Sequence, residues 1–119
     1  MSGLPAARSA ADGGAPHYRW GGVCEGWRLL DGEDLSVIEE AVPPGAGERR
    51  HLHARARQCF YVLSGCALIE FDDGAVELVA GQSLEVPPGI AHRFHNPGDL
   101  PVRFLVISAP ATRGDREDL

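Results

Sequence analysis

The stretch GAGERRHLHARARQCFYVLSG, residues 45–65, places two histidines one residue apart and a glutamine five residues after the second. Successive side chains of a β-strand point to opposite faces, so His51 and His53 project to the same side if this segment is extended. Neutral imidazole is the commonest protein ligand for zinc, iron, copper and nickel. Because such a pair also occurs by chance, it predicts a metal site only where a further ligand lies nearby.

Composition restricts the class of protein. A chain of 119 residues, with 44% apolar and 24% charged residues, is typical of one soluble globular domain. No apolar run reaches the roughly 18 residues of a membrane span. A net charge of −6 argues against a nucleic-acid surface, which needs clustered cations. The expected partner is a small-molecule ligand, with no nucleic acid and no membrane.

Short apolar runs alternate with glycine and proline turns between residues 20 and 108, and no amphipathic helix of useful length is present. About seven runs at this spacing predict an all-β sandwich or barrel of antiparallel strands. The Asp73-Gly74 dipeptide predicts a tight hairpin, because glycine tolerates positive φ. The run PVRFLVIS, residues 101–108, predicts a strand with both faces covered, with Arg103 at an edge or facing a polar cavity.

The chain divides into three parts. Residues 1–16 are expected to form a flexible leader, residues 17–110 the barrel domain, and residues 111–119 a charged, peripheral tail. The start lacks the apolar core of a signal peptide, and the three cysteines include no CxxC pair. We therefore expect reduced thiols and a cytoplasmic location.

A second histidine-bearing stretch, PPGIAHRFHN at residues 87–96, follows a proline-glycine turn. In a β-barrel such a turn can return the chain beside the strand that carries the histidine pair. His92, Phe94 and Asn96 share one face of this stretch, and His95 lies on the other. His92 is therefore the candidate third metal ligand, and His95 is expected on the surface.

Together these stretches resemble the two motifs of the cupin superfamily, in the right order. The first reads Gly45, His51, His53, Gln58 and Gly65, with gaps of five, one, four and six residues. The second reads Gly81, Pro87, Gly89, His92 and Asn96, with gaps of five, one, two and three residues. The resemblance implies a small jelly-roll-like β-barrel with an interior metal, held by His51, His53, His92 and position 58. The family has glutamate at that last position, where this chain has Gln58.

The glutamine changes the chemistry expected at such a site. A carboxamide cancels no metal charge and takes up no proton near neutral pH, so it leaves a more electrophilic ion and no general base in the ligand shell. Gln58 either ligates weakly through its carbonyl oxygen, donates an N–H to substrate or water, or pairs with a histidine in a site that has lost its metal. Zinc or ferrous iron suits three histidines, and manganese and nickel are alternatives.

The four arginines around the histidine pair, Arg49, Arg50, Arg55 and Arg57, are expected to form a solvated rim, with an anion-attracting mouth as the alternative. Trp20 and Trp27 cover the barrel mouth or pack at a dimer seam. A homodimer is expected, because open sheet edges need protection.

By strand parity, Phe60, Val62 and Phe94 line the substrate pocket or belong to the core. The expected function is a metal-dependent enzyme acting on a small organic molecule, with Gln58 binding or orienting that molecule. Its chemistry would be that of a Lewis-acid isomerase, cyclase or lyase, or of an oxygenase. A non-catalytic module that binds a metabolite or metal, and a purely structural barrel, are the alternatives.

Overall fold

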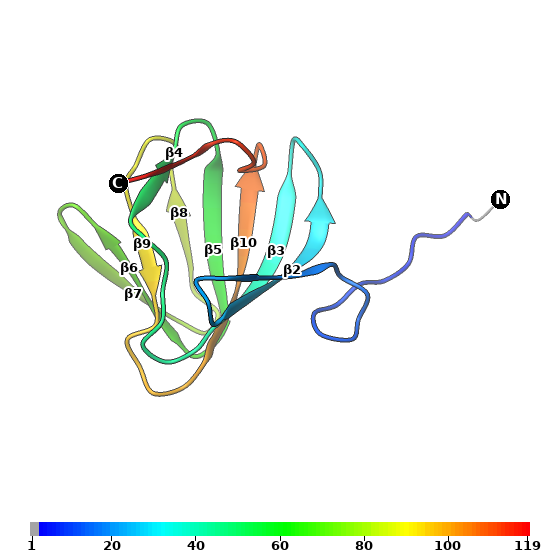
Figure 1. Cartoon of the computed structure of the whole chain (residues 1–119), viewed down its shortest axis with the longest axis horizontal. Helices are drawn as coiled ribbons and strands as arrows, with labels where there is room; N and C mark the ends of the chain where they lie inside the picture. Colours follow the sequence, from blue (N-terminus) through cyan, green and yellow to red (C-terminus); the bar gives the residue numbers. More distant parts are fainter. Residues whose placement is uncertain (1–2) are drawn as a thin grey trace.

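The computed structural model describes residues 3–119; Met1 and Ser2, part of the expected leader, lie outside the described residues. The described chain is all-β with antiparallel strand pairs, as predicted (Figure 1). Its strands are β1 His17–Trp20, β2 Cys24–Asp31, β3 Ser36–Val42, β4 His51–His53, β5 Arg57–Ser64, β6 Cys66–Phe71, β7 Gly74–Val79, β8 Ser83–Val86, β9 Arg93–His95, β10 Val102–Ala109 and β11 Arg116–Asp118. Within residues 3–119 no helix is long and apolar enough to cross a membrane.

The strands form two layers around one core (Figure 1). The larger sheet has the order β1-β2-β3-β10-β5-β8, and the smaller has the order β7-β6-β9. The chain just before β4 runs antiparallel to β9, through hydrogen bonds from the Glu48 N–H to the Phe94 carbonyl and from the Asn96 N–H to the Ala46 carbonyl. The β11-β4 pair, a separate two-stranded sheet, therefore lies alongside the smaller sheet, joined to it by isolated bridges at Gly47–His95 and His51–His92.

The predicted hairpin at Asp73-Gly74 joins β6 and β7, where Phe71 pairs with Gly74. The prediction for β10 is wrong in one respect, because its burial alternates along the strand instead of covering both faces. Arg103 lies neither at an edge nor in a cavity. On the outer face of this central strand it binds Glu39 of β3, and its guanidinium carbon lies 5.0 Å from the centre of the Trp27 ring.

The core between the sheets is built around three aromatic rings. The Phe94 and Phe104 ring centroids are 3.9 Å apart, and Phe60 lies 5.8 Å from Phe94. Asn96 is fully buried beside them, yet its amide is satisfied: it donates to the Val42 and Leu100 carbonyls, and its oxygen accepts the Gly98 N–H. The motif asparagine is thus a structural residue that ties the turn after β9 to β3.

The C-terminal segment differs from the peripheral tail expected for residues 111–119. It crosses from the end of β10 to β4, where β11 pairs with the strand of the two histidines (Figure 1). The Asp115 side chain, 1% exposed, accepts the Arg55 N–H at 3.0 and 3.1 Å and the Ala56 N–H at 2.8 Å. Burial alone would raise the pKa of Asp115, but these hydrogen bonds lower it. The hydrogen bonds from these two backbone N–H groups to the Asp115 carboxylate anchor the C-terminal segment.

Replacing Asp115 with alanine should lower the free energy of unfolding by about 2–4 kcal/mol, because the buried Ala56 N–H and the part-buried Arg55 N–H lose their acceptor, at about 1–3 kcal/mol for a buried group. Urea denaturation measures this change. The control is Glu117→Ala, which removes an exposed carboxylate from the same segment and should cost less than about 0.5 kcal/mol. Equally small effects of the two substitutions would contradict the anchoring role of Asp115.

Candidate metal centre

His51 and His92 face each other across a backbone bridge between the two motifs. The His51 N–H donates to the His92 carbonyl at 3.1 Å, and the His92 N–H donates back to the His51 carbonyl at 2.9 Å. Each ring nitrogen Nδ1 lies near the carbonyl two residues earlier, that of Arg49 at 2.7 Å and that of Ile90 at 2.8 Å. A proton on Nδ1 that donates to this carbonyl leaves the Nε2 lone pair free, as metal-binding histidines require.

The third histidine completes a cluster of imidazoles. The His51 ring centroid lies 4.9 Å from that of His53 and 4.5 Å from that of His92, and the other two are 6.2 Å apart. Burial lowers the pKa of all three rings, that of His51 to about 4. All three are therefore neutral at pH 7, the form that binds a metal ion.

Buried polar atoms without partners indicate what these residues fit. Within residues 3–119, five buried side-chain nitrogen or oxygen atoms have no hydrogen-bond partner, and three of them are His53 Nδ1, Gln58 Oε1 and His92 Nε2. Each such atom costs about 1–3 kcal/mol when left unpaired. Such lone pairs are what a divalent metal binds, so these residues are candidate ligands, although His53 lies outside the group of ligand atoms within 4.8 Å of one another that His51 and His92 form with Glu48.

Gln58 is oriented by its neighbour across the sheet. Ser108 pairs with Gln58 in the β5–β10 register, and the Gln58 Nε2 donates to the Ser108 Oγ at 3.2 Å. With the amide nitrogen engaged, the carbonyl oxygen is the free polar atom of this side chain. This arrangement favours the first of the roles considered above, a carbonyl ligand.

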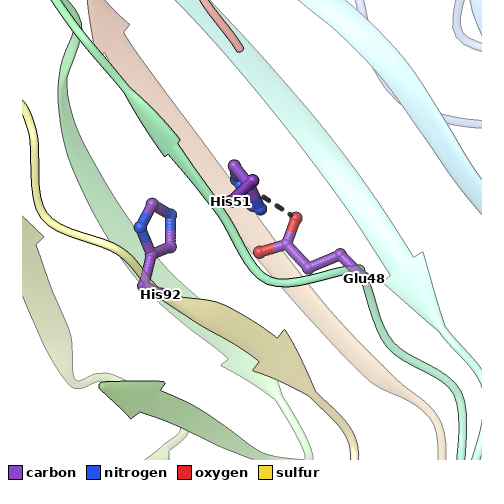
Figure 2. A group of neighbouring side chains, drawn as sticks. All are labelled: Glu48, His51 and His92. Atoms are coloured by element: carbon purple, nitrogen blue, oxygen red, sulfur yellow. Dashed lines mark ion pairs between the residues drawn. The ribbon is translucent and has the colours of Figure 1, made fainter. Parts of the chain in front are cut away.

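Glu48 is a site residue that the sequence analysis missed. Figure 2 shows its carboxylate directed toward the His51 ring, with His92 on the neighbouring segment. One oxygen accepts the Phe94 N–H at 3.0 Å, and the other lies 3.8 Å from the His51 Nε2. Potential ligand atoms of Glu48, His51 and His92 all lie within 4.8 Å of one another. A carboxyl group is therefore present at the cluster although position 58 holds an amide, and burial raises the pKa of this carboxyl to about 8.

The imidazoles lie beside a cavity of about 280 Å³ between the sheets. Its wall combines apolar and polar side chains: Trp20, Ile38, Phe60, Val106, Tyr18, Arg28, Glu40, Glu48, His51, His53, Gln58, Ser108, Thr112, Arg113 and Arg116. Phe60 is thus a cavity residue. Val62 and Phe94, the other pocket candidates, are 0% and 1% exposed and belong to the core.

A tyrosine–glutamate pair occupies the cavity wall formed by β1–β3. Tyr18 pairs with Gly26, which in turn pairs with Glu40, so the Tyr18 ring lies over Gly26 and its hydroxyl donates to the Glu40 carboxylate at 2.5 Å. A Cβ at Gly26 would overlap that ring, which explains the glycine. Burial raises the pKa of Glu40 to about 7 despite the Tyr18 hydrogen bond. From the sequence no general base is expected in the ligand shell; Glu40 is a candidate base elsewhere in the cavity wall.

The arginines around the histidine pair in sequence are not those of the cavity. Arg49, Arg50, Arg55 and Arg57 are exposed, as the rim interpretation predicts; Arg50 and Arg57 pair with surface carboxylates and Arg55 with the buried Asp115. The cationic residues of the cavity wall are instead Arg28, Arg113 and Arg116. Strand parity could not predict that Arg113 and Arg116, from the C-terminal segment, line the cavity.

The remaining histidine and the two tryptophans have separate places. His95 is outside the cavity wall, but its side chain is only 21% exposed, because it packs near Glu70 of β6, with 3.6 Å between Nδ1 and Oε1. It is therefore less exposed than expected. Trp20 lines the cavity, whereas Trp27 lies on the outer face under Arg103.

Two antiparallel sheets that gather imidazoles from two sequence motifs beside an interior cavity define a small β-barrel protein with a candidate metal centre. A family model described as a cupin domain matches residues 38–108. This chain belongs to the cupin family.

Sequence relatives share part of their length with this chain. An uncharacterized protein of Methanocaldococcus jannaschii is 30% identical over 82 residues, which cover 69% of this chain and 66% of that protein. The xanthan biosynthesis protein XanB of Xanthomonas campestris pv. campestris is 30% identical over 84 residues, 71% of this chain and 18% of XanB. The chain therefore spans less than two thirds of either relative.

Solved structures share the fold. An RmlC-like cupin from Shewanella frigidimarina has a TM-score of 0.77 and 24% identity, covering 88% of this chain and 92% of that one. A sugar phosphate isomerase of the cupin superfamily from Silicibacter pomeroyi has a TM-score of 0.67 and 27% identity, covering 74% and 60%. The polyketide cyclase RemF from Streptomyces resistomycificus has a TM-score of 0.71 and 22% identity, covering 81% and 70%.

The Glu40 carboxyl should make stability depend on pH. Its pKa is about 7 in the folded state against 4.5 ordinarily, so between these values the unfolded chain loses the proton that the folded protein keeps, and stability falls as pH rises. The Glu40→Gln variant has no ionisable carboxyl at this position, so its stability does not fall for this reason as pH rises. Urea denaturation of metal-free protein should show the variant gaining on the order of 2–3 kcal/mol over wild type between pH 4.5 and pH 7.

The matched control is Glu117→Gln on exposed β11, whose stability relative to wild type should stay within about 0.5 kcal/mol across the same range. A Glu40→Gln variant that follows the wild-type pH curve would show that the carboxyl titrates as it does in water.

Proposed function

We propose that this chain is a metal-dependent enzyme that acts on a small organic molecule in the interior cavity, with the metal held by His51, His53 and His92. The observation that carries the proposal is the set of buried, unpartnered atoms on His53, Gln58 and His92. Hydrogen bonds within the fold account for most buried polar atoms of a protein, so three exceptions in one cluster point to a ligand.

Two oxygen donors lie at the same cluster. Gln58 offers its free Oε1, and Glu48 offers the oxygen that does not accept the Phe94 N–H. Three imidazoles, an amide and a carboxylate suit zinc or ferrous iron, with manganese and nickel as alternatives. In this proposal Glu48 supplies the negative charge that a glutamate at position 58 would otherwise bring.

A bound divalent cation would supply Lewis acidity toward a carbonyl, hydroxyl or enolate oxygen of the substrate, or oxygen activation if it is iron. The chain itself supplies the proton acceptor. The Glu40 carboxyl, with a pKa of about 7, can accept and return a proton near neutral pH, and the Tyr18 hydroxyl fixes its orientation. This supports isomerase, cyclase or lyase chemistry, and the similar sugar phosphate isomerase supports the first.

Metal binding tests the proposal directly. Chelator-treated protein without a histidine tag should bind Zn²⁺ or Co²⁺, measured by calorimetric titration and by metal content after dialysis. His51→Ala and His92→Ala should each weaken binding by more than about 100-fold, since even residues that only orient a ligand are worth about 10–100-fold.

The control for these variants is His95→Ala, which removes a histidine outside the cavity and should leave affinity within about twofold. A wild-type protein that binds no metal, or a His95→Ala variant as impaired as His92→Ala, would refute the proposed centre.

The two oxygen donors, Glu48 and Gln58, can be distinguished experimentally because only Glu48 can carry a negative charge. Glu48→Gln removes a negative charge and should weaken Zn²⁺ binding by about 100-fold, whereas Gln58→Leu removes a neutral ligand and should weaken it by about tenfold. Gln58→Glu should strengthen binding, because it adds a carboxylate. Calorimetry measures all three, and unchanged affinity in all of them would exclude both oxygens from the ligand set.

A further inference from the structure

We infer that the molecule bound in the cavity carries a carboxylate or phosphate group and that the Arg28 guanidinium binds this group; the inference rests on the proposed function. Arg28 projects into the cavity from β2, in the same wall as Tyr18 and Glu40. The metal cluster forms the other end of that cavity wall, through His51, His53 and Gln58. The ligand would therefore be held at two ends.

Arg28 is distinguished from the other cavity arginines because no carboxylate accepts a hydrogen bond from it, although its charge lowers the pKa of Glu40 in the same wall. Arg113 donates to both Asp31 oxygens, at 3.1 and 2.9 Å, and Arg116 donates to Asp118 at 2.7 Å and lies 4.0 Å from a Glu48 carboxyl oxygen. The Arg28 guanidinium makes no hydrogen bond and no ion pair with any residue from 3 to 119. Half-buried cations are normally paired, so this one has capacity for an anion from outside the chain.

The Arg28 side chain is nevertheless held in place. Its guanidinium carbon lies 4.6 Å from the centre of the Tyr18 ring, a stacking distance at which the ring face attracts a cation. The Tyr18 ring is itself fixed, because it covers Gly26 on one side and donates to Glu40 through its hydroxyl. A fixed guanidinium presents its N–H groups as a planar fork, which matches the two oxygens of a carboxylate or phosphate.

The sheet register sets the reach of the ligand. Arg28 pairs with Ile38, Ile38 with Val106, and Val106 with Phe60, so three strand spacings of about 4.8 Å separate Arg28 from β5. Gln58 lies two residues before Phe60 on the same face of β5. The cavity of about 280 Å³ equals the volume of about nine water molecules at about 30 Å³ each. A small molecule with its anionic group at one end and a metal-binding oxygen at the other fits this space.

Binding of simple anions tests the inference. The probes are succinate and inorganic phosphate, with uncharged succinamide as the neutral comparison, titrated into Zn²⁺-loaded and metal-free protein by calorimetry. Wild type should bind at least one of the two anions, more tightly than succinamide, and the preferred anion identifies the group as carboxylate or phosphate. Arg28→Gln should weaken that binding by at least about tenfold, because a charge-assisted hydrogen bond is lost.

Two further variants make the result specific. Arg28→Lys keeps the charge without the fork and should retain part of the affinity. Arg113→Gln removes a cavity arginine that is already paired with Asp31 and should leave anion affinity within about twofold. Thermal unfolding confirms that each variant is folded.

The outcomes separate the inference from the proposed function. If wild type shows no preference for an anion, or if Arg28→Gln binds the anions as wild type does, the inference is overturned while Zn²⁺ binding remains as measured. If the protein binds no Zn²⁺ but the metal-free form loses anion binding on Arg28→Gln, the anion site stands and the metal centre fails.

Discussion

The backbone pairing of His51 with His92 is the constraint on which the rest of the molecule depends. Two hydrogen bonds, of 3.1 and 2.9 Å, join segments some forty residues apart, and they hold β4 beside the segment that leads into β9. The same pairing sets two imidazoles with centroids 4.5 Å apart. Because the Glu48 N–H and carboxylate both bond to Phe94 along this seam, the carboxylate is turned toward the imidazoles by the closure of the sandwich itself.

The sequence predicted the antiparallel β-fold and the positions of the three histidines because these depend on local periodicity and fixed motif spacing. Glu48 was visible three residues before His51, but its inward orientation comes from an N–H donor on β9, which periodicity cannot show. Glu40 carried a stronger signal that was overlooked. In the run SVIEEAV two adjacent glutamates must face opposite sides, so one of them had to point into the core.

The C-terminal segment shows the limit of composition as a guide. The charges of residues 111–119 predict a solvated tail, yet one of its carboxylates accepts the part-buried Arg55 N–H and the buried Ala56 N–H beside the strands of the candidate site. Charge identifies a surface residue only where no unsatisfied backbone donor lies within reach. Here the turn before β5 exposes such donors, and Asp115 meets them. The segment also brings Arg113 and Arg116 to the cavity, so a part expected to be peripheral supplies part of the wall of the candidate site.

The charges of the cavity explain why its metal and its anion site would depend on each other. Arg113 and Arg116 are balanced by acidic partners, and Glu40 and Glu48 are held by hydrogen bonds from Tyr18 and Phe94. A divalent cation would favour the ionised form of Glu48, which offsets only one of its two charges. One positive charge at the metal then remains, and Arg28, whose charge interacts with Glu40 without a hydrogen bond, adds another in a half-enclosed space. An anionic ligand that reaches both would remove this excess, which makes the binding of metal and ligand mutually favourable.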